Sequence, residues 1–195
     1  MRKLRWVLFV FLVLACSTAV WAAIVTLRFD ELPFQPVDGL SFSGVTFGFT
    51  VAGVPSTDAH YNSFGPGIIT YVQDPSLEGD ATGTLSLDFD VPTPVLQFGV
   101  AISATGAFAR GFSVELFDPN LVSIGVFDVA TASIVSFSES RFSYQGPPVQ
   151  RAVITFNGAV APRFALDNLT FDNGMASVPT ANRQRFAPSG KAWER

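Results

Sequence analysis

The sequence predicts an all-β protein, a two-sheet antiparallel β-sandwich with a jelly-roll-like arrangement. Apolar residues alternate with polar ones in many short runs, which is the period of a strand with one buried face. Turn residues interrupt these runs roughly every eight to twelve positions, and no run has the period of a helix. The chain has 195 residues, of which 48% are hydrophobic and 14% charged, and this composition supports one domain with a sizeable core.

The first half of the chain contains two alternating runs and one shorter expected strand. Residues 24–29 form an apolar alternation that ends at two acids and a proline, and residues 45–51 alternate Val and Phe with Thr and Gly. Residues 52–67 are rich in Gly, Pro and polar side chains, so we expect a long irregular loop. Residues 68–72 are expected to form a short strand, and residues 73–83 a second polar loop.

The middle of the chain holds the clearest strands. Residues 85–91 and 96–102 both alternate, and Pro-Thr-Pro separates them. Residues 112–116 and 122–126 flank Asp118-Pro119-Asn120, which indicates a tight hairpin turn. One face of each strand is therefore apolar and the other polar, as in an antiparallel sheet.

Shorter strands are expected toward the end of the domain. Residues 134–137 and 142–144 are brief apolar runs, and Gly-Pro-Pro at 146–148 is expected to break the chain. Residues 152–156 form the penultimate strand. The closing strand covers residues 164–171.

The closing strand contains one residue too many for strict alternation. Its four apolar residues can face one core only if a β-bulge lies between Leu166 and Leu169. Such a bulge would turn Asp167 and Asn168 together toward the opposite face or a rim. We therefore predict a bulged strand that carries a polar pair.

The N-terminal residues 1–22 have the features of a signal peptide. A basic start precedes an apolar segment, and small residues permit cleavage before Ala23. We expect a secreted protein, extracellular or periplasmic, with no membrane span after cleavage. The alternative is a lipoprotein, because Val-Leu-Ala-Cys ending at Cys16 resembles a bacterial lipobox.

Two further segments follow the signal peptide. Residues 23–174 are expected to form the sandwich, and residues 175–195 a disordered basic tail, because the apolar pattern stops there. Residues 23–182 contain five Arg, no Lys and 15 acidic residues, a net charge of −10. An acidic domain lacks the cationic surface that nucleic acid or anionic lipid requires, but it is compatible with divalent cations and neutral glycans.

Four segments carry a resemblance to a known family. Residues 26–32, 85–89, 112–118 and 164–171 together resemble the exported β-sandwich domains of bacterial PEP-CTERM proteins, which are similar to carbohydrate-binding jelly rolls. The resemblance implies the fold and an exported location. Members usually end in a Val-Pro-Glu-Pro motif, an apolar helix and an Arg cluster, whereas this chain keeps only the Val-Pro of that motif and lacks the C-terminal anchor.

Acidic residues at the two ends of the domain suggest a metal site. Asp30 and Glu31 end the first strand, and Asp167 and Asn168 lie in the last; terminal strands often pair in jelly rolls of this type. Their oxygen atoms suit a structural Ca²⁺, which accepts six to eight oxygen ligands in loose geometry. The alternative is that they are ordinary polar residues at solvated strand ends.

Aromatic residues suggest a sugar-binding rim. We identify His60, Tyr61, Tyr71 and Tyr144 as candidates, because an exposed aromatic ring combines an apolar face with a polar tip. The alternative is that these rings fill the ends of the sandwich, as many do in a chain with 20 Phe.

Catalysis has little support. His60 is the only histidine, which excludes a multi-His metal site, and no Gly-x-Ser-x-Gly motif is present. Asp88 and Asp90 are the one close carboxylate pair that could hydrolyse glycosides, although they also suit an exposed sheet face. We predict a non-catalytic surface, matrix or accessory binding module that contacts extracellular polysaccharide or surface matrix. The alternatives are a lectin-like glycan-binding domain and a secreted hydrolase.

Overall fold

The computed structural model describes residues 23–174, which contain strands and no helix. The predicted signal peptide, Cys16 and the basic tail lie outside the described residues. Within the described part, no helix has the length and apolarity needed to cross a membrane. The strands in chain order are β1 (Ile24–Leu27), β2 (Gln35–Pro36), β3 (Ser41–Phe42), β4 (Val45–Val51), β5 (Val54–Pro55), β6 (His60–Ser63), β7 (Ser76–Asp80), β8 (Gly83–Ile102), β9 (Phe108–Phe117), β10 (Ser123–Ile134), β11 (Phe137–Phe156) and β12 (Arg163–Asp172).

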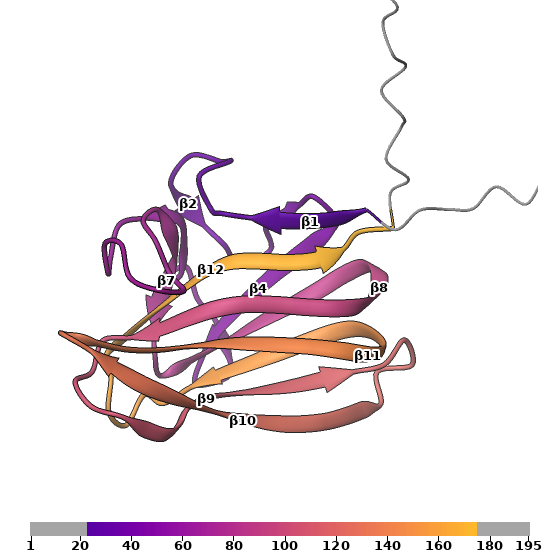
Figure 1. The fold of residues 1–195 in the computed structure, drawn as a ribbon. Coiled ribbons are helices and arrows are strands. Elements are labelled where there is room, and N and C mark those ends of the chain that lie inside the picture. The colour runs from indigo at the N-terminus through magenta and orange to yellow at the C-terminus, as the bar shows by residue number, and fades with distance from the viewer. Residues whose placement is uncertain (1–22, 175–195) are drawn as a thin grey trace, which may run out of the picture.

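Two long strands join the two layers of an antiparallel sandwich. The first half of β8 pairs with β4, whereas its second half pairs with β12. β11 likewise pairs with β9 along its end and with the second half of β8 along its start. Both long strands curl back at the same end of the molecule (Figure 1). The first layer therefore contains β4, β9 and the adjoining halves of β8 and β11, and the second contains β1, β7, β12 and the remaining halves.

The core lies between these layers and is largely aromatic. Phe49 of β4 contacts Phe164 of β12, with ring centroids 5.9 Å apart, and Phe89 contacts Phe171 across 5.1 Å. All four side chains are buried. These contacts confirm the predicted two-sheet antiparallel sandwich, because the inward positions of strands in one layer meet those of the other.

The predicted bulge in the closing strand is present. The register between β12 and β8 shifts between Asp167 and Thr170, and Asn168 has a φ of 56°. Asn tolerates this left-handed conformation better than other residues with a Cβ. The four apolar side chains on either side of the bulge are buried in one core: Phe164, Leu166, Leu169 and Phe171.

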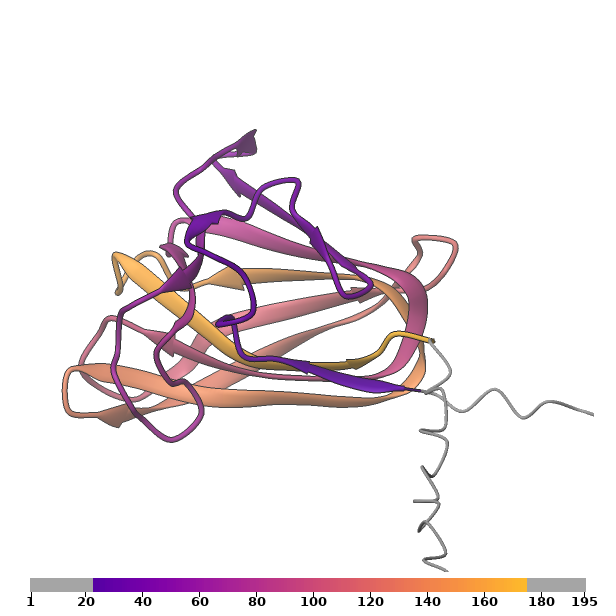
Figure 2. The same ribbon diagram turned by 90° about the horizontal axis from the view of Figure 1, so that it is seen from above.

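The predicted pairing of the terminal strands is also present. β1 pairs with β12 in the register Leu27 with Leu169 and Thr26 with Thr170. The two strands run side by side in both views (Figure 2). This pairing brings the end of the first strand next to the bulge.

Several predicted boundaries are wrong. Residues 68–72 form a loop in which Ile68 is 84% exposed, and the expected loop at 73–83 contains β7. The expected loop at 52–67 contains β5 and β6. The expected separate strand at 134–137 is instead the end of a hairpin: Ile134 ends β10, Phe137 begins β11, and the two pair across the turn at 135–136.

The proline segments do not interrupt the long strands as expected. β8 continues through Pro92-Thr93-Pro94, and β11 continues through Pro147-Pro148 with register shifts on either side of Val149. Both segments lie where the strands pass from one layer to the other. A missing N–H is tolerated there because a bend already interrupts the hydrogen-bond ladder.

The left-handed conformation at the bulge is open to a direct test. Replacing Asn168 by Val should lower the free energy of unfolding by about 1–2 kcal/mol more than replacing it by Gly, because a β-branched residue is strained at positive φ. Both variants lose the Asn168 side-chain hydrogen bonds, so their difference isolates the backbone term. Urea unfolding followed by far-UV circular dichroism measures it, and equal stabilities would contradict the explanation.

Candidate functional site

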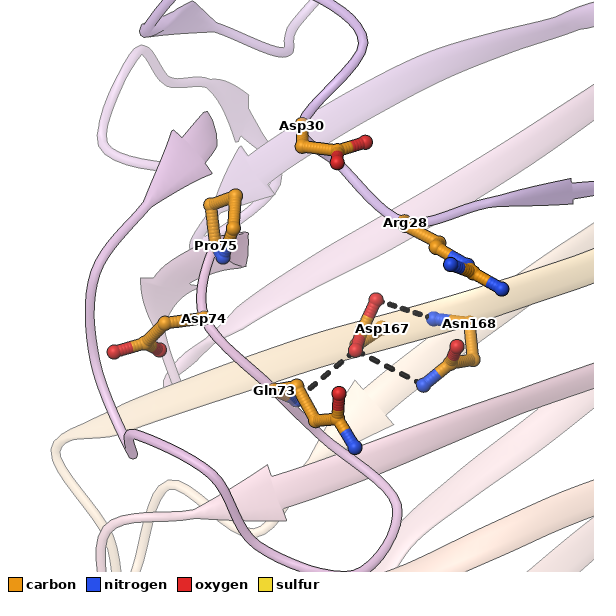
Figure 3. A pocket seen from close by; sticks show the side chains of 7 residues that line it. All are labelled: Arg28, Asp30, Gln73, Asp74, Pro75, Asp167 and Asn168. Carbon is orange, nitrogen blue, oxygen red and sulfur yellow. Dashed lines mark hydrogen bonds between the residues drawn. The ribbon is translucent and has the colours of Figure 1, made fainter.

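The bulge places Asp167 and Asn168 on the outer face of the second layer. Asp167 is 3% exposed. One carboxylate oxygen accepts a hydrogen bond from the backbone N–H of Asn168 at 2.6 Å. The other accepts the backbone N–H of Gln73 and the side-chain amide of Asn168, both at 2.9 Å (Figure 3). Asp167 thus connects the closing strand to the segment before β7.

That segment, loop 64–75, lies over the outer face and is fixed by carboxylates. Glu139 of β11 accepts the backbone N–H groups of Thr70 and Tyr71 at 3.0 and 2.9 Å. Asp74 accepts those of Gly65 and Gly67 from within the loop. Backbone donors held by charged acceptors make strong hydrogen bonds, so the loop is well positioned without regular secondary structure.

Close packing also holds the loop against the sheet. Val72 is buried against Ala101 and Ala165. At Gly99 of β8, an added Cβ would lie 2.1 Å from the carbonyl oxygen of Tyr71, so this position accepts only glycine. Tyr71 itself remains 37% exposed beside the sheet.

A first pocket of about 360 Å³ opens on one side of this loop. It is lined by Arg28, Asp30, Gln73, Asp74, Pro75, Asp167 and Asn168 (Figure 3). Three of the predicted metal ligands therefore share a pocket. The fourth, Glu31, is used elsewhere: its carboxylate accepts the backbone N–H of Arg28 at 2.8 Å and the hydroxyl of Tyr61 at 2.5 Å.

The oxygen atoms of this pocket are already largely engaged. Asp167 accepts three hydrogen bonds, while a carboxylate has about four acceptor sites. The carboxylate of Asp74 points away from Asp167 in Figure 3. Among residues 23–174, no three His, Cys, Asp or Glu side chains are grouped so that they could hold a metal ion. Calcium binding stays a prediction.

Burial raises the pKa of Asp167 to about 6, from an ordinary value of 3.8. The loss of solvation disfavours the charged carboxylate more than the hydrogen bonds from Asn168 and Gln73 favour it. Glu31 raises the pKa further through like-charge repulsion, and Arg28 lowers it.

A second pocket of about 310 Å³ adjoins the first, because Asn168 lines both. Its other lining residues are Thr26, Thr70, Tyr71, Gln97, Gly99, Arg141 and Thr170. Neighbouring strands supply its floor, since Thr26 pairs with Thr170 and Thr170 pairs with Gln97. We call the two adjoining pockets the groove.

The groove offers hydrogen-bonding groups and one aromatic ring. The guanidinium of Arg141 lies 5.7 Å from the ring centroid of Tyr71, a cation–π contact that orients both side chains. The hydroxyls of Thr26 and Thr170 are 2.8 Å apart and form a polar edge. Such a surface can bind a flexible polar ligand through several hydrogen bonds and one stacking contact.

The four predicted aromatic candidates do not form a common rim. Of these, only Tyr71 lines the groove. Tyr61 was wrongly predicted as a surface residue: it is 0% exposed and packs edge-on to Phe29, because it lies on the inward side of β6. Burial and its hydrogen bond to Glu31 raise the pKa of this hydroxyl.

The other two candidates lie apart from the groove. His60 stacks on Phe34 with ring centroids 4.6 Å apart, and its Nδ1 pairs with the carbonyl oxygen of Asp58. Tyr144 is half-buried and packs on the core, with its hydroxyl donating to the carbonyl oxygen of Pro147.

The carboxylate pair considered for hydrolysis is not a matched pair. Asp88 forms an ion pair with Arg151, in which Nε lies 2.5 Å from Oδ1. Asp90, two residues further along the chain, is exposed. A general acid must reach the leaving-group oxygen, and the Asp88 oxygen is already occupied by the guanidinium of Arg151. This arrangement does not favour glycoside hydrolysis at Asp88.

The chain was compared with known proteins. No family model matches it, and no curated protein matches it. A family 29 carbohydrate-binding module from Piromyces equi is similar in structure, with a TM-score of 0.41, 14% identity, and 79% of this chain and 92% of that chain covered.

Two further structures of family 29 carbohydrate-binding modules show a similar degree of likeness. A mutant of another family 29 module has a TM-score of 0.42 and 12% identity, over 83% of this chain and 100% of that chain. A mutant of the same module complexed with mannohexaose has a TM-score of 0.41 and 12% identity, with 80% of this chain and 95% of that chain covered. Likeness at this level carries no argument about what this chain binds. The PEP-CTERM resemblance likewise stays a prediction.

Sequence reasoning missed most of the groove. Thr26, Gln97 and Thr170 are ordinary polar positions of alternating strands, and nothing in their local sequence distinguishes them from other outward positions. Arg141 offered one signal, because the acidic domain contains only five cations. Their convergence depends on strand pairing between residues far apart in the chain.

The raised pKa of Asp167 predicts a pH dependence of stability. The folded state binds this proton more tightly than the unfolded state. The free energy of unfolding should therefore fall as pH rises from about 4 to about 6, by on the order of 3 kcal/mol at most. Above about pH 6, Asp167 should contribute no further change in stability. Asp167→Asn should remove this component.

Chemical unfolding of both proteins across this pH range measures the component. An NMR titration should also place the midpoint of the Asp167 carboxyl near 6. A midpoint near 4 would contradict the assignment of burial as the dominant cause.

Proposed function

We propose that the protein is a non-catalytic carbohydrate-binding module and that the groove on the outer face of the second layer is its binding surface. The observation that carries this proposal is the exposed ring of Tyr71, fixed beside the amide and hydroxyl groups of Asn168, Gln97 and Thr170. Sugars present apolar C–H faces and polar hydroxyls, so they match a surface with both kinds of group.

Rigidity supports the same proposal. Three of the groove residues, Gln97, Arg141 and Thr170, stand on paired strands, and Tyr71 is held by backbone hydrogen bonds to Glu139. A surface already in its binding geometry loses little conformational entropy when a ligand arrives. The pocket volume of about 310 Å³ lies at the lower end of the range usual for ligand sites.

The groove chemistry favours binding over a purely structural surface role. A matrix component has no need for a polar pocket whose ring and guanidinium are mutually oriented. Export fits this function, because polysaccharides lie outside the cell, and we propose it on the strength of the signal-like residues 1–22.

Replacing Tyr71 by Ala should weaken binding to a soluble polysaccharide by on the order of tenfold or more, because the stacking contact is lost. Affinity electrophoresis or calorimetry against a panel of neutral and acidic polysaccharides measures this change. Phe64→Ala is the matched control, since Phe64 lies in the same loop, is 77% exposed and lines neither pocket of the groove. Undiminished binding of the Tyr71 variant would contradict this assignment of the surface.

Calcium is a second proposal, supported by the position of Asp30, Asp167 and Asn168 in one pocket. A structural ion there would link the first and last strands. Calcium at 100 times its dissociation constant should then stabilise the fold by about 2.7 kcal/mol.

Thermal melts in calcium, in magnesium and in chelator test this second proposal. Asp30→Asn should abolish the calcium effect without removing the Asp167 hydrogen bonds. Identical melting temperatures in calcium and chelator would exclude a structural ion.

A further inference from the structure

The cations of the described domain divide into two groups. Three form ion pairs: Arg110 with Asp128 at 3.9 Å, Arg151 with Asp88 at 2.5 Å and Arg163 with Asp58 at 2.9 Å. The other two arginines within residues 23–174, Arg28 and Arg141, form no ion pair. Both line the groove, one in each pocket.

The two arginines mark opposite sides of one row across the sheet. Arg28 follows Leu27, which pairs with Leu169 of β12. Arg141 of β11 pairs with Gly99 of β8, which in turn pairs with Asp167. The row therefore runs across four adjacent segments of chain: the end of β1, then β12, β8 and β11. At about 4.8 Å between neighbouring strands, the backbones at its two ends are roughly 14 Å apart across the sheet.

Two carboxylates of this face, those of Glu139 and Asp167, are occupied by other donors. Both oxygens of Glu139 accept backbone N–H groups of loop 64–75, and Asp167 accepts three hydrogen bonds. Asp30 is exposed and lines the first pocket with Arg28 but forms no ion pair with it. Arg28 interacts electrostatically with Asp167, whose pKa it lowers, whereas Arg141 lies in a pocket with no acidic lining residue. Arg141 is therefore the groove arginine whose guanidinium donors lack a carboxylate partner.

We propose that the groove binds a glycan that carries anionic groups, carboxylate or sulfate, with Arg141 as the main anion contact and Arg28 as a second. This inference rests on the proposed carbohydrate-binding function and specifies its ligand class. A guanidinium presents a planar fork of donors that matches the two oxygens of a carboxylate or sulfate. The ring of Tyr71, whose centroid is 5.7 Å from the guanidinium carbon, holds that fork at the groove through a cation–π contact.

The acidic net charge of the domain is compatible with this ligand. Charges on other faces are screened over about 8 Å at physiological ionic strength. The second pocket is lined by Arg141 and by no acidic residue, so an anionic group that binds there meets a positive charge. Two isolated arginines cannot neutralise the closely spaced phosphates of a nucleic acid. They can contact separate anionic groups on a glycan whose charges are spaced along its sugar rings.

The decisive experiment compares a polyuronate with its carboxyl-reduced product, which has the same backbone without the charge, and with a sulfated polysaccharide. The protein should bind the polyuronate or the sulfated polymer at least about tenfold more tightly than the reduced polymer at low salt, and the preference should shrink as salt rises. Which anionic polymer is preferred identifies the anion as carboxylate or sulfate.

Variants connect this preference to the groove. Arg141→Gln should abolish the preference, which is measured as the ratio of the two affinities so that a general loss of binding cancels. Arg141→Lys should retain part of the preference because the charge remains without the planar fork. Arg110→Gln is the control, since Arg110 is also exposed but pairs with Asp128 outside the groove. Circular dichroism confirms that each variant is folded.

Two outcomes would overturn the inference, and they are distinguishable. Equal binding of the polyuronate, sulfated and reduced polymers, or an unchanged preference in Arg141→Gln, would reject the anionic ligand and leave the carbohydrate-binding function intact. Failure of the folded protein to bind any of the three, or any member of the neutral panel, would reject both.

Discussion

The β-bulge at Asp167 and Asn168 is the constraint on which the rest of the structure depends. In a regular strand without the bulge, the apolar side chains on either side of this point would lie on opposite faces, because the side-chain period of a strand is two. With it, Leu166 and Leu169 both enter the core. The same insertion turns two polar side chains outward, so one local feature closes the sandwich and builds the centre of the groove.

Carboxylates in this protein act mainly as acceptors for backbone N–H groups. Asp74, Glu139 and Asp167 together hold loop 64–75, which has no strand of its own to bind it to the sheet. This use leaves Arg141 of the groove in a pocket without an acidic residue, although the domain is strongly acidic. The distribution of hydrogen-bond partners, rather than net charge, therefore decides what this surface can bind.

Alternation predicted the fold class, the core residues of the main strands and the hairpin at Asp118-Pro119-Asn120, because these depend on local pattern and turn chemistry. Boundaries failed where tertiary contacts override the pattern. The apolar run at 68–72 resembles a strand, yet it has no strand partner and is held by side chains from distant strands. β6 and β7 lie in polar sequence and become strands through pairing: β7 adds to the edge of β12, and β6 adds to β7.

The sequence by itself determined an all-β sandwich, a bulged closing strand with an outward polar pair, and an acidic domain with few cations. Residue period and composition are local properties, so they can be read from the chain directly. Only the tertiary structure decided that Tyr61 is buried, that Glu31 is engaged by it, and that Tyr71 and Arg141 meet beside Asn168. The physical reason is strand pairing, which brings together side chains separated by many residues and which no local period encodes.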